Sequence, residues 1–180
     1  MKVGVFYASR HGSTRGIAEY VAQVLRERGF AAEAVDAGGE EAPEGLEGCE
    51  AFVLGSALYY GAWLEEGVRF ARAVGDRMRE EERWLPVWIF SSGPLGVRPD
   101  DPESQPRQLA ELTEWLKPRE HRIFHGALAH RRLGFAERMV VKGVRAPEGD
   151  FRDWEAIRSW AESIAEELDG GGPAEGARDA

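Results

Sequence analysis

Short apolar runs alternate with segments of helical periodicity along this chain, and that alternation limits its fold more than any other feature. The run at 3–7 is apolar on nearly every residue, as in a strand that is buried on both faces. After Gly12, the apolar residues Ile17 and Val21 recur at helical spacing, and Gly29 ends the helix. Repeated strand–helix units of this kind predict a parallel sheet with helices packed on it.

The same alternation continues to residue 168. We predict strands at 3–7, 31–35, 51–54, 87–90 and 123–128. We predict helices at 17–25, 63–83, 109–116 and 154–168. Gly55 and Ser56 are expected to close the third strand, and Asp150 is expected to cap the last helix. The predicted fold class is therefore α/β, a five-stranded parallel sheet with helices on both faces.

The length of 180 residues fits a single domain. Apolar residues make up 43% of the chain and charged residues 31%, a globular composition that argues against a disordered or fibrous protein. We assign the folded domain to 1–168, where the helical periodicity ends. The glycine-rich residues 169–180 are expected to form a flexible C-terminal tail.

Charge and cysteine content argue against several kinds of site. Lys and Arg total 23 against 32 for Asp and Glu, and the net charge of −9 disfavours nucleic-acid binding, which needs many cationic contacts. The single cysteine, Cys49, excludes an internal disulfide and a cysteine-rich zinc site. His121 and His125 would share a strand face too far apart to chelate, and His130 does not complete a set, so no metal site is predicted.

No segment has the length of a membrane span. The longest mostly apolar stretch, 51–64, is interrupted by glycine and serine, whereas a span needs about 20 apolar residues. The first residues do not resemble a secretory signal peptide, because Arg10 and His11 follow the short apolar run at once. Together with the low cysteine content, these features predict a cytoplasmic protein.

The loop after the first strand has the chemistry of an anion site. Ligands of open parallel sheets bind beyond the carboxyl ends of the strands, where this loop lies. Gly12 permits close approach of the backbone, and the first amides of the following helix are unpaired. The alternative is an ordinary helix start with surface hydroxyls. The candidate residues are Ser9, Arg10, His11, Gly12, Ser13 and Thr14.

The pattern Ser-x-His-Gly-Ser-Thr resembles the phosphate loop of flavodoxins, Thr/Ser-x-Thr/Ser-Gly-x-Thr. Ser9, Gly12 and Thr14 match that pattern, whereas His11 replaces a hydroxyl residue and could donate an imidazole N–H instead. The resemblance implies a flavodoxin-like fold that binds FMN, with the phosphate on this loop. Lysine-containing phosphate loops and the G-x-G-x-x-G dinucleotide turn are both absent from the sequence.

The loops after the third and fourth strands stand where flavodoxin-like proteins hold the two sides of the flavin ring. Loops that contain glycine can approach a flat heterocycle closely, and a tyrosine can cover its face. The alternative for these tyrosines is packing at the top of the sheet, and Trp63 could serve only to anchor the next helix. The candidates are Ser56, Ala57, Leu58, Tyr59, Tyr60 and Gly61 in the second loop, and Ser91, Ser92, Gly93, Pro94, Leu95 and Gly96 in the third.

The C-terminal half is similar to flavodoxin-like, quinone-dependent protoporphyrinogen oxidases. The similarity rests on the segments 124–128 and 149–154, with support from Arg10-His11-Gly12 and Tyr60-Gly61. It implies an FMN-dependent oxidoreductase that passes electrons from a reduced substrate to a quinone or a similar acceptor. The flavin would carry the redox chemistry, so no catalytic side chain is predicted.

A basic segment lies between His130 and Arg145, with five cations and one acid in an otherwise acidic chain. Such a segment could contact an anionic membrane surface or receive an acidic, porphyrin-like substrate. The alternative is a helix that covers a sheet edge with a solvated basic face.

Two other functions stay open. The first is a flavodoxin-type electron carrier, whose excess of acid would suit docking on basic redox partners. The second is a flavodoxin fold that has lost its flavin and serves as a binding module, which the departure at His11 would favour.

Overall fold

The computed structural model of the chain describes residues 1–38, 46–93, 104–128 and 149–170. Its main sheet has the strand order β2-β1-β3-β5-β6, and each neighbouring pair is parallel, so the predicted five-stranded sheet is confirmed. The five strands are β1 (Lys2–Ala8), β2 (Ala31–Asp36), β3 (Ala51–Tyr59), β5 (Val87–Ser92) and β6 (Glu120–Phe124).

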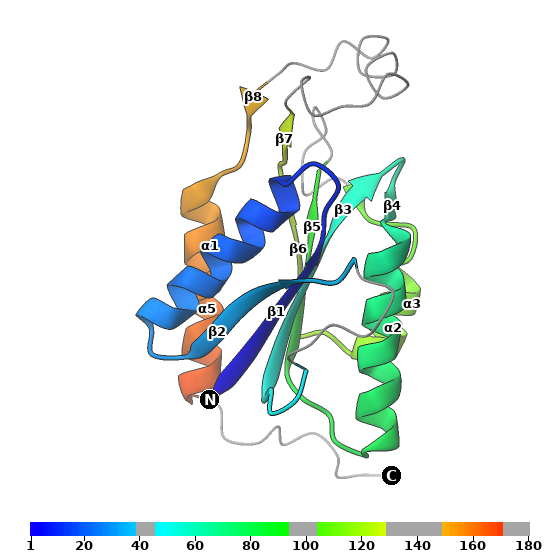
Figure 1. Cartoon of the computed structure of the whole chain (residues 1–180), viewed down its shortest axis with the longest axis vertical. Coiled ribbons are helices and arrows are strands. Elements are labelled where there is room, and N and C mark those ends of the chain that lie inside the picture. The colour runs from blue at the N-terminus through cyan, green and yellow to red at the C-terminus, as the bar shows by residue number, and fades with distance from the viewer. Residues whose placement is uncertain (39–45, 94–103, 129–148, 171–180) are drawn as a thin grey trace.

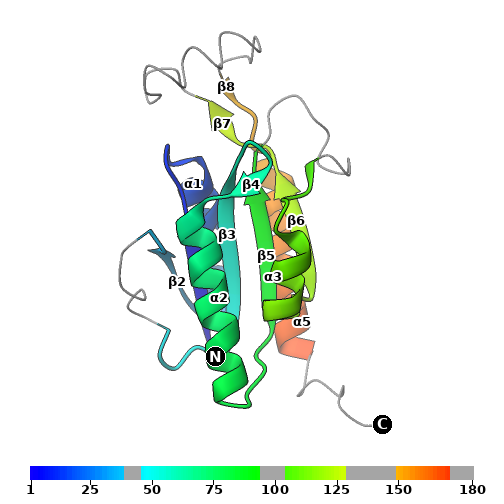
Figure 2. The ribbon, with the colours of Figure 1, turned by 90° about the vertical axis from the view of Figure 1, so that its right-hand side faces the viewer.

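Helices cover both faces of this sheet, as predicted (Figures 1 and 2). One face carries α1 (Ser13–Glu27) and α5 (Trp154–Gly170), and the other carries α2 (Glu65–Glu80) and α3 (Leu109–Leu116). Each face has its own apolar core, because every residue of β5 and nearly every residue of β1 is buried. This explains the continuous apolar runs in the sequence.

Three short strands complete the structure at the carboxyl edge of the sheet. β4 (Ala62–Trp63) folds back antiparallel onto the end of β3. β7 (Ala127–Leu128) and β8 (Gly149–Asp150) pair with each other in a separate two-stranded sheet. These additions lie where the functional loops were expected (Figure 1).

The expected end of the third strand at Gly55 and Ser56 is wrong, because β3 continues to Tyr59. Gly55 is not a turn residue. A Cβ atom added there would overlap the ring of Phe90, so glycine is required for close packing inside the sheet. Ser56 is fully buried.

The boundaries of later elements also differ from the sequence analysis. β6 begins at Glu120 and ends at Phe124, and the residues to 128 belong to the separate β7 strand. The second helix begins only at Glu65, because Trp63 belongs to β4 and is paired there with Leu58 of β3.

The cap of α5 is Asp153 and not Asp150. Asp153 Oδ1 accepts the backbone N–H of Ala156 at 2.9 Å, whereas Asp150 binds the side chain of Arg152. Residues 169 and 170, assigned to the tail, belong to α5. The remainder of the expected tail, 171–180, lies outside the described residues.

Candidate functional site

The ends of three adjacent strands bring the first and second loops together and start the third beside them. Ala8 of β1 is in register with Ser56 of β3, which is in turn in register with Ser91 of β5. The first loop therefore leaves β1 next to the extended end of β3. The parallel register, and not any single contact, sets the spacing between these loops.

The first loop presents an uncapped helix terminus. Gly12 is the N-cap of α1, with φ at 85° in the left-handed region, and it has no side chain with which to cap the helix. The loop is closed from within, because the Gly12 amide donates to Ser9 Oγ at 3.1 Å. The described first turn of α1 contains no acidic side chain. Its amides and the positive end of the helix dipole thus favour an anion.

Ser13 joins this loop to two other elements. Its Oγ accepts the backbone N–H of Ala127 at 2.8 Å and lies 3.4 Å from Ser92 Oγ. A Cβ atom on Gly126 would lie 3.2 Å from Ser13 Oγ, so glycine allows the close approach of the β6–β7 connection. Ser13 therefore fixes the site's geometry besides being a candidate ligand.

The second loop is a tight hairpin between β3 and β4. Tyr60 and Gly61 both have positive φ, at 50° and 73°, as in the turns that favour Asn-Gly. Tyr60 is 74% exposed. Tyr59 packs against the first loop: Arg10 Cζ lies 5.1 Å from the centre of its ring, and the His11 ring lies 6.2 Å away.

The described part of the third loop approaches the second closely. Gly93 has φ at 118°, and a Cβ atom there would lie 3.5 Å from Leu58. The Gly93 amide donates to the carbonyl of Phe124 at 2.9 Å, which fixes the exit of the chain from β5. The candidates Pro94, Leu95 and Gly96 lie outside the described residues.

Two of the candidate serines point into the protein. Ser56 Oγ accepts the backbone N–H of Leu64 at 3.1 Å and so holds the hairpin against the start of α2. Ser91 Oγ accepts the indole N–H of Trp63 at 2.7 Å and lies 2.9 Å from His121 Nε2. These side chains support the loops from beneath.

Burial lowers the pKa of His121 to about 4, although nearby Glu120 acts in the opposite direction. The imidazole is therefore neutral near pH 7. Because the indole N–H of Trp63 can only donate, the Ser91 hydroxyl can donate its own proton to His121 Nε2. This buried chain of hydrogen bonds connects β4, β5 and β6 beneath the loops.

Sequence analysis missed the residues just before α3. The Arg107 amide donates to the Gly61 carbonyl at 2.9 Å, and Gln108 Oε1 accepts the backbone N–H of Trp63 at 3.2 Å. Arg107 therefore stands directly beside the hairpin turn. No glycine, hydroxyl or charge pattern marks this segment in the sequence, so only the tertiary contact reveals it.

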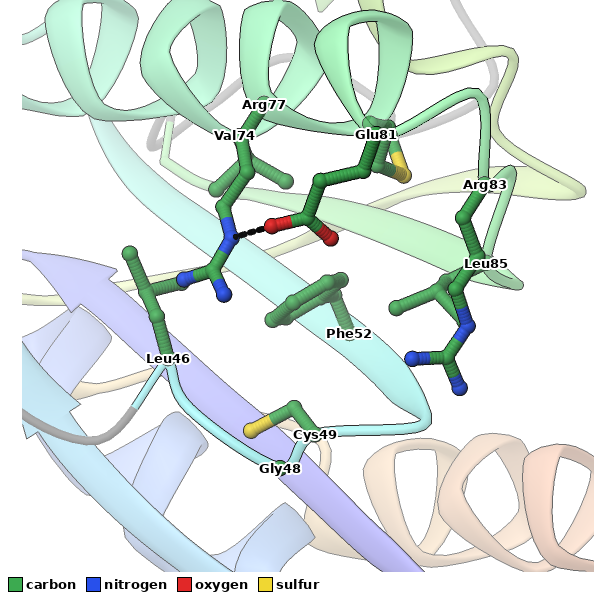
Figure 3. A pocket seen from close by; sticks show the side chains of 10 residues that line it. Leu46, Gly48, Cys49, Phe52, Val74, Arg77, Glu81, Arg83 and Leu85 are labelled. Carbon is green, nitrogen blue, oxygen red and sulfur yellow. Dashed lines mark hydrogen bonds and ion pairs between the residues drawn. The ribbon is translucent and has the colours of Figure 1, made fainter.

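An open hollow of about 570 Å³ lies outside the first loop and is lined by Arg10, His11, Gly12, Arg15, Gly16 and Glu19. Arg15 is paired with Glu19 at 2.7 Å. A second pocket, at the opposite end of the sheet, lies among Cys49, Phe52 and the end of α2 (Figure 3). Its volume is about 40 Å³, which suits a few waters and excludes an aromatic cofactor.

The residues present fit a planar cofactor with a phosphate group. The uncapped amides after Gly12 are donors for a dianion, and Gly93 brings the backbone of the third loop close to Leu58 of the hairpin. Among the described residues, no group of three or more potential metal-binding side chains comes together. Within the same ranges, no helix has the length and apolar character needed to cross a bilayer.

Comparisons with known proteins agree with this arrangement. The family described as Flavodoxin domain matches residues 4–154. Protoporphyrinogen IX dehydrogenase (quinone) of Escherichia coli K12 is 24% identical over 178 residues, covering 92% of this chain and 95% of the relative.

Two solved structures share the fold. A flavodoxin mutant from Pseudomonas aeruginosa superposes with a TM-score of 0.60 at 17% identity, over 94% of this chain and all of that chain. Rubredoxin oxygen:oxidoreductase from Desulfovibrio gigas gives 0.61 at 15% identity, over 94% of this chain and 36% of that one. At these identities the two structures establish the fold alone.

Proposed function

Because this chain belongs to the flavodoxin-domain family, we propose that it is an FMN-dependent oxidoreductase that passes electrons from a reduced substrate to a quinone or a similar acceptor. Family membership implies a flavin cofactor. The observation that carries the proposal is the uncapped, glycine-led start of α1 beside the β3–β4 hairpin. The relative of 24% identity supports an enzyme of the protoporphyrinogen-oxidising kind over a simple carrier.

The first loop would hold the FMN phosphate. The amides of the first turn of α1 supply donors, and Ser9 and Thr14 supply hydroxyls. Gly12 is essential to this role, because its left-handed conformation turns the chain so that the amides come together. His11 takes the place of a hydroxyl residue and would contribute an imidazole N–H.

The second and third loops would hold the flavin ring, with candidates 56–61 and 91–96. Gly93 lies close to Leu58, and the absence of a side chain there would let the third loop approach a flat ring. When bound, the flavin accepts electrons from the substrate and gives them to the acceptor. The protein's own part is to bind and orient the cofactor and to shield it from water.

A porphyrin-like substrate remains our proposal for the basic segment between His130 and Arg145, which lies outside the described residues. The residues that flank 129–148 are paired with each other, since Leu128 is in register with Gly149. The pair is attached to the first loop through the bond from Ala127 to Ser13. Peripheral contact with a membrane is part of the same proposal.

The test is a spectrum followed by a turnover assay. The purified protein is incubated with FMN, desalted and examined for a retained flavin spectrum. The loaded protein is then assayed for oxidation of protoporphyrinogen with a water-soluble quinone. We expect retained FMN and quinone-dependent turnover. Retained FMN without turnover would remove the substrate, and absence of retained FMN would remove the redox function.

A flavodoxin-type electron carrier is the second candidate, favoured by the net charge of −9. A redox titration distinguishes the two. A carrier is expected to take up electrons in two separated one-electron steps, whereas a two-electron dehydrogenase need not separate them.

A further inference from the structure

Two arginines lie beside the exposed hairpin turn of the site, and neither is paired with an acid among the residues that the structure describes. Arg10 leaves the first loop and lies over the ring of Tyr59, at 5.1 Å from Cζ to the ring centre. Arg107 lies near the next residues of the turn, and its Nε would lie 3.8 Å from a Cβ atom on Gly61. Both arginines are exposed, and Tyr60, which lies between Tyr59 and Gly61 in the chain, is 74% exposed.

Most arginines in the described ranges of this protein are paired with acids, and these two are not among them. Most other arginines of the described ranges have a carboxylate within 4.0 Å, among them Arg15, Arg28, Arg72, Arg77, Arg79, Arg119, Arg122, Arg152 and Arg158. Within those ranges, neither Arg10 nor Arg107 has one. In a chain with a net charge of −9, these two arginines form a cationic rim at the turn among the described residues.

The turn itself carries backbone strain. Tyr60 has φ at 50°, a conformation that costs a bulky side chain about 1 kcal/mol. Asparagine or glycine would make the same turn without that cost. An aromatic side chain kept exposed at such a position has the properties of a contact surface for a planar ligand.

We propose that Arg10 and Arg107 bind the carboxylates of the proposed porphyrinogen substrate, with Tyr60 against its ring. This inference rests on the proposed oxidoreductase function and adds the groups that select its substrate. Guanidinium groups suit carboxylates because their planar fork can donate two parallel hydrogen bonds. The two arginines are selectivity residues, and no redox step passes through them.

The test measures ligand binding apart from turnover. Protoporphyrin IX, the stable oxidised product, is titrated into FMN-loaded protein in a non-ionic detergent, and its dimethyl ester is titrated in parallel. The variants are Arg10→Glu, Arg107→Glu and the pair. The matched control is Arg83→Glu, which reverses an exposed arginine at the rim of the small pocket at the far end of the sheet (Figure 3).

We expect each reversal to weaken binding of the dicarboxylate by about tenfold, because it replaces an attraction with a repulsion. The dimethyl ester and the Arg83→Glu variant should show wild-type behaviour. In turnover, Arg107→Glu should raise KM and leave kcat nearly unchanged. Arg10→Lys and Arg107→Lys should recover part of the affinity, since they restore the charge.

Several results would overturn the inference. One is that the variant with both Arg10→Glu and Arg107→Glu binds protoporphyrin IX as tightly as the Arg83→Glu variant does. Another is loss of FMN from Arg10→Glu, because Arg10 would then belong to the cofactor site. Failure of the wild-type protein to bind protoporphyrin while it retains FMN would remove this inference and leave the flavin function intact. Loss of FMN by the wild-type protein would instead remove the proposed function itself.

Discussion

The buried histidine beneath the loops predicts a specific dependence of stability on pH. Its pKa is about 4 in the folded protein, whereas an unfolded histidine titrates near 6.5. At pH values between these two, His121 binds a proton in the unfolded chain and does not bind one in the folded chain. The contribution of His121 to the free energy of unfolding is therefore fully present above about pH 6.5, and it is lost as the pH falls toward 4.

The size of this effect follows from the same two values. A difference of about 2.5 in pKa, at about 1.4 kcal/mol per pH unit, corresponds to at most about 3.5 kcal/mol. The window between pH 6.5 and 5 is the most informative, because carboxylates titrate mainly below it. Protonation would also disturb Ser91, which already accepts the indole N–H of Trp63.

The assay is urea unfolding at several pH values between 7 and 4.5, on the wild-type protein and on His121→Gln. Glutamine can still accept from the Ser91 hydroxyl and does not titrate. We expect His121→Gln to lose most of the fall in stability between pH 6.5 and 5. The control, His125→Gln, makes the same change at another histidine of the chain, while the bond to Ser91 is made by His121. Equal pH dependence in wild type and His121→Gln would refute the reasoning.

Three further predictions test other parts of the structure. Gly12→Ala should lower stability by about 1 kcal/mol because of its positive φ, and should weaken FMN binding in a titration. Tyr60→Asn should raise stability by about 0.5 kcal/mol in thermal unfolding, because asparagine adopts positive φ at lower cost. Glu82→Asn, at a residue with φ at 49°, is the control and should raise stability similarly. Only Tyr60→Asn should weaken porphyrin binding. Gly55→Ala should cost about 1–3 kcal/mol through overlap with Phe90, and Phe90→Leu should recover part of that loss; an additive double mutant would contradict this packing.

The fold could be predicted because its signals are local. Each buried strand is a continuous apolar run, and each helix has its own periodicity, as in α1 and α5. Their alternation leaves a parallel sheet as the simplest arrangement. The turn in the first loop could be predicted in the same way, because Gly12 lies between a strand and a helix, where the chain has to turn.

The errors arose where a residue's role depends on a distant partner. Gly55 was interpreted as a turn, but the ring of Phe90 explains it, and nothing local in the sequence shows that ring above it. Ser91 and Ser92 are adjacent hydroxyls that face opposite sides of β5, toward Trp63 and toward Ser13. Only the strand register distinguishes them.

Arg107 shows the limit of motif-based analysis. It reaches the site because its amide binds the Gly61 carbonyl, a contact between segments that lie 46 positions apart in the chain. Isolated surface arginines are common, so composition and spacing could not have selected this one. The cationic rim therefore became visible only once the hairpin and the residues before α3 were seen together.

The central claim is that the uncapped start of α1 holds the phosphate of FMN. The most direct measurement is calorimetric titration of the flavin-free protein with FMN and, separately, with riboflavin, which lacks the phosphate. Several hydrogen bonds to a dianion predict binding of FMN at least about 100-fold tighter than riboflavin. Equal affinity for the two flavins, or binding of neither, would contradict the account.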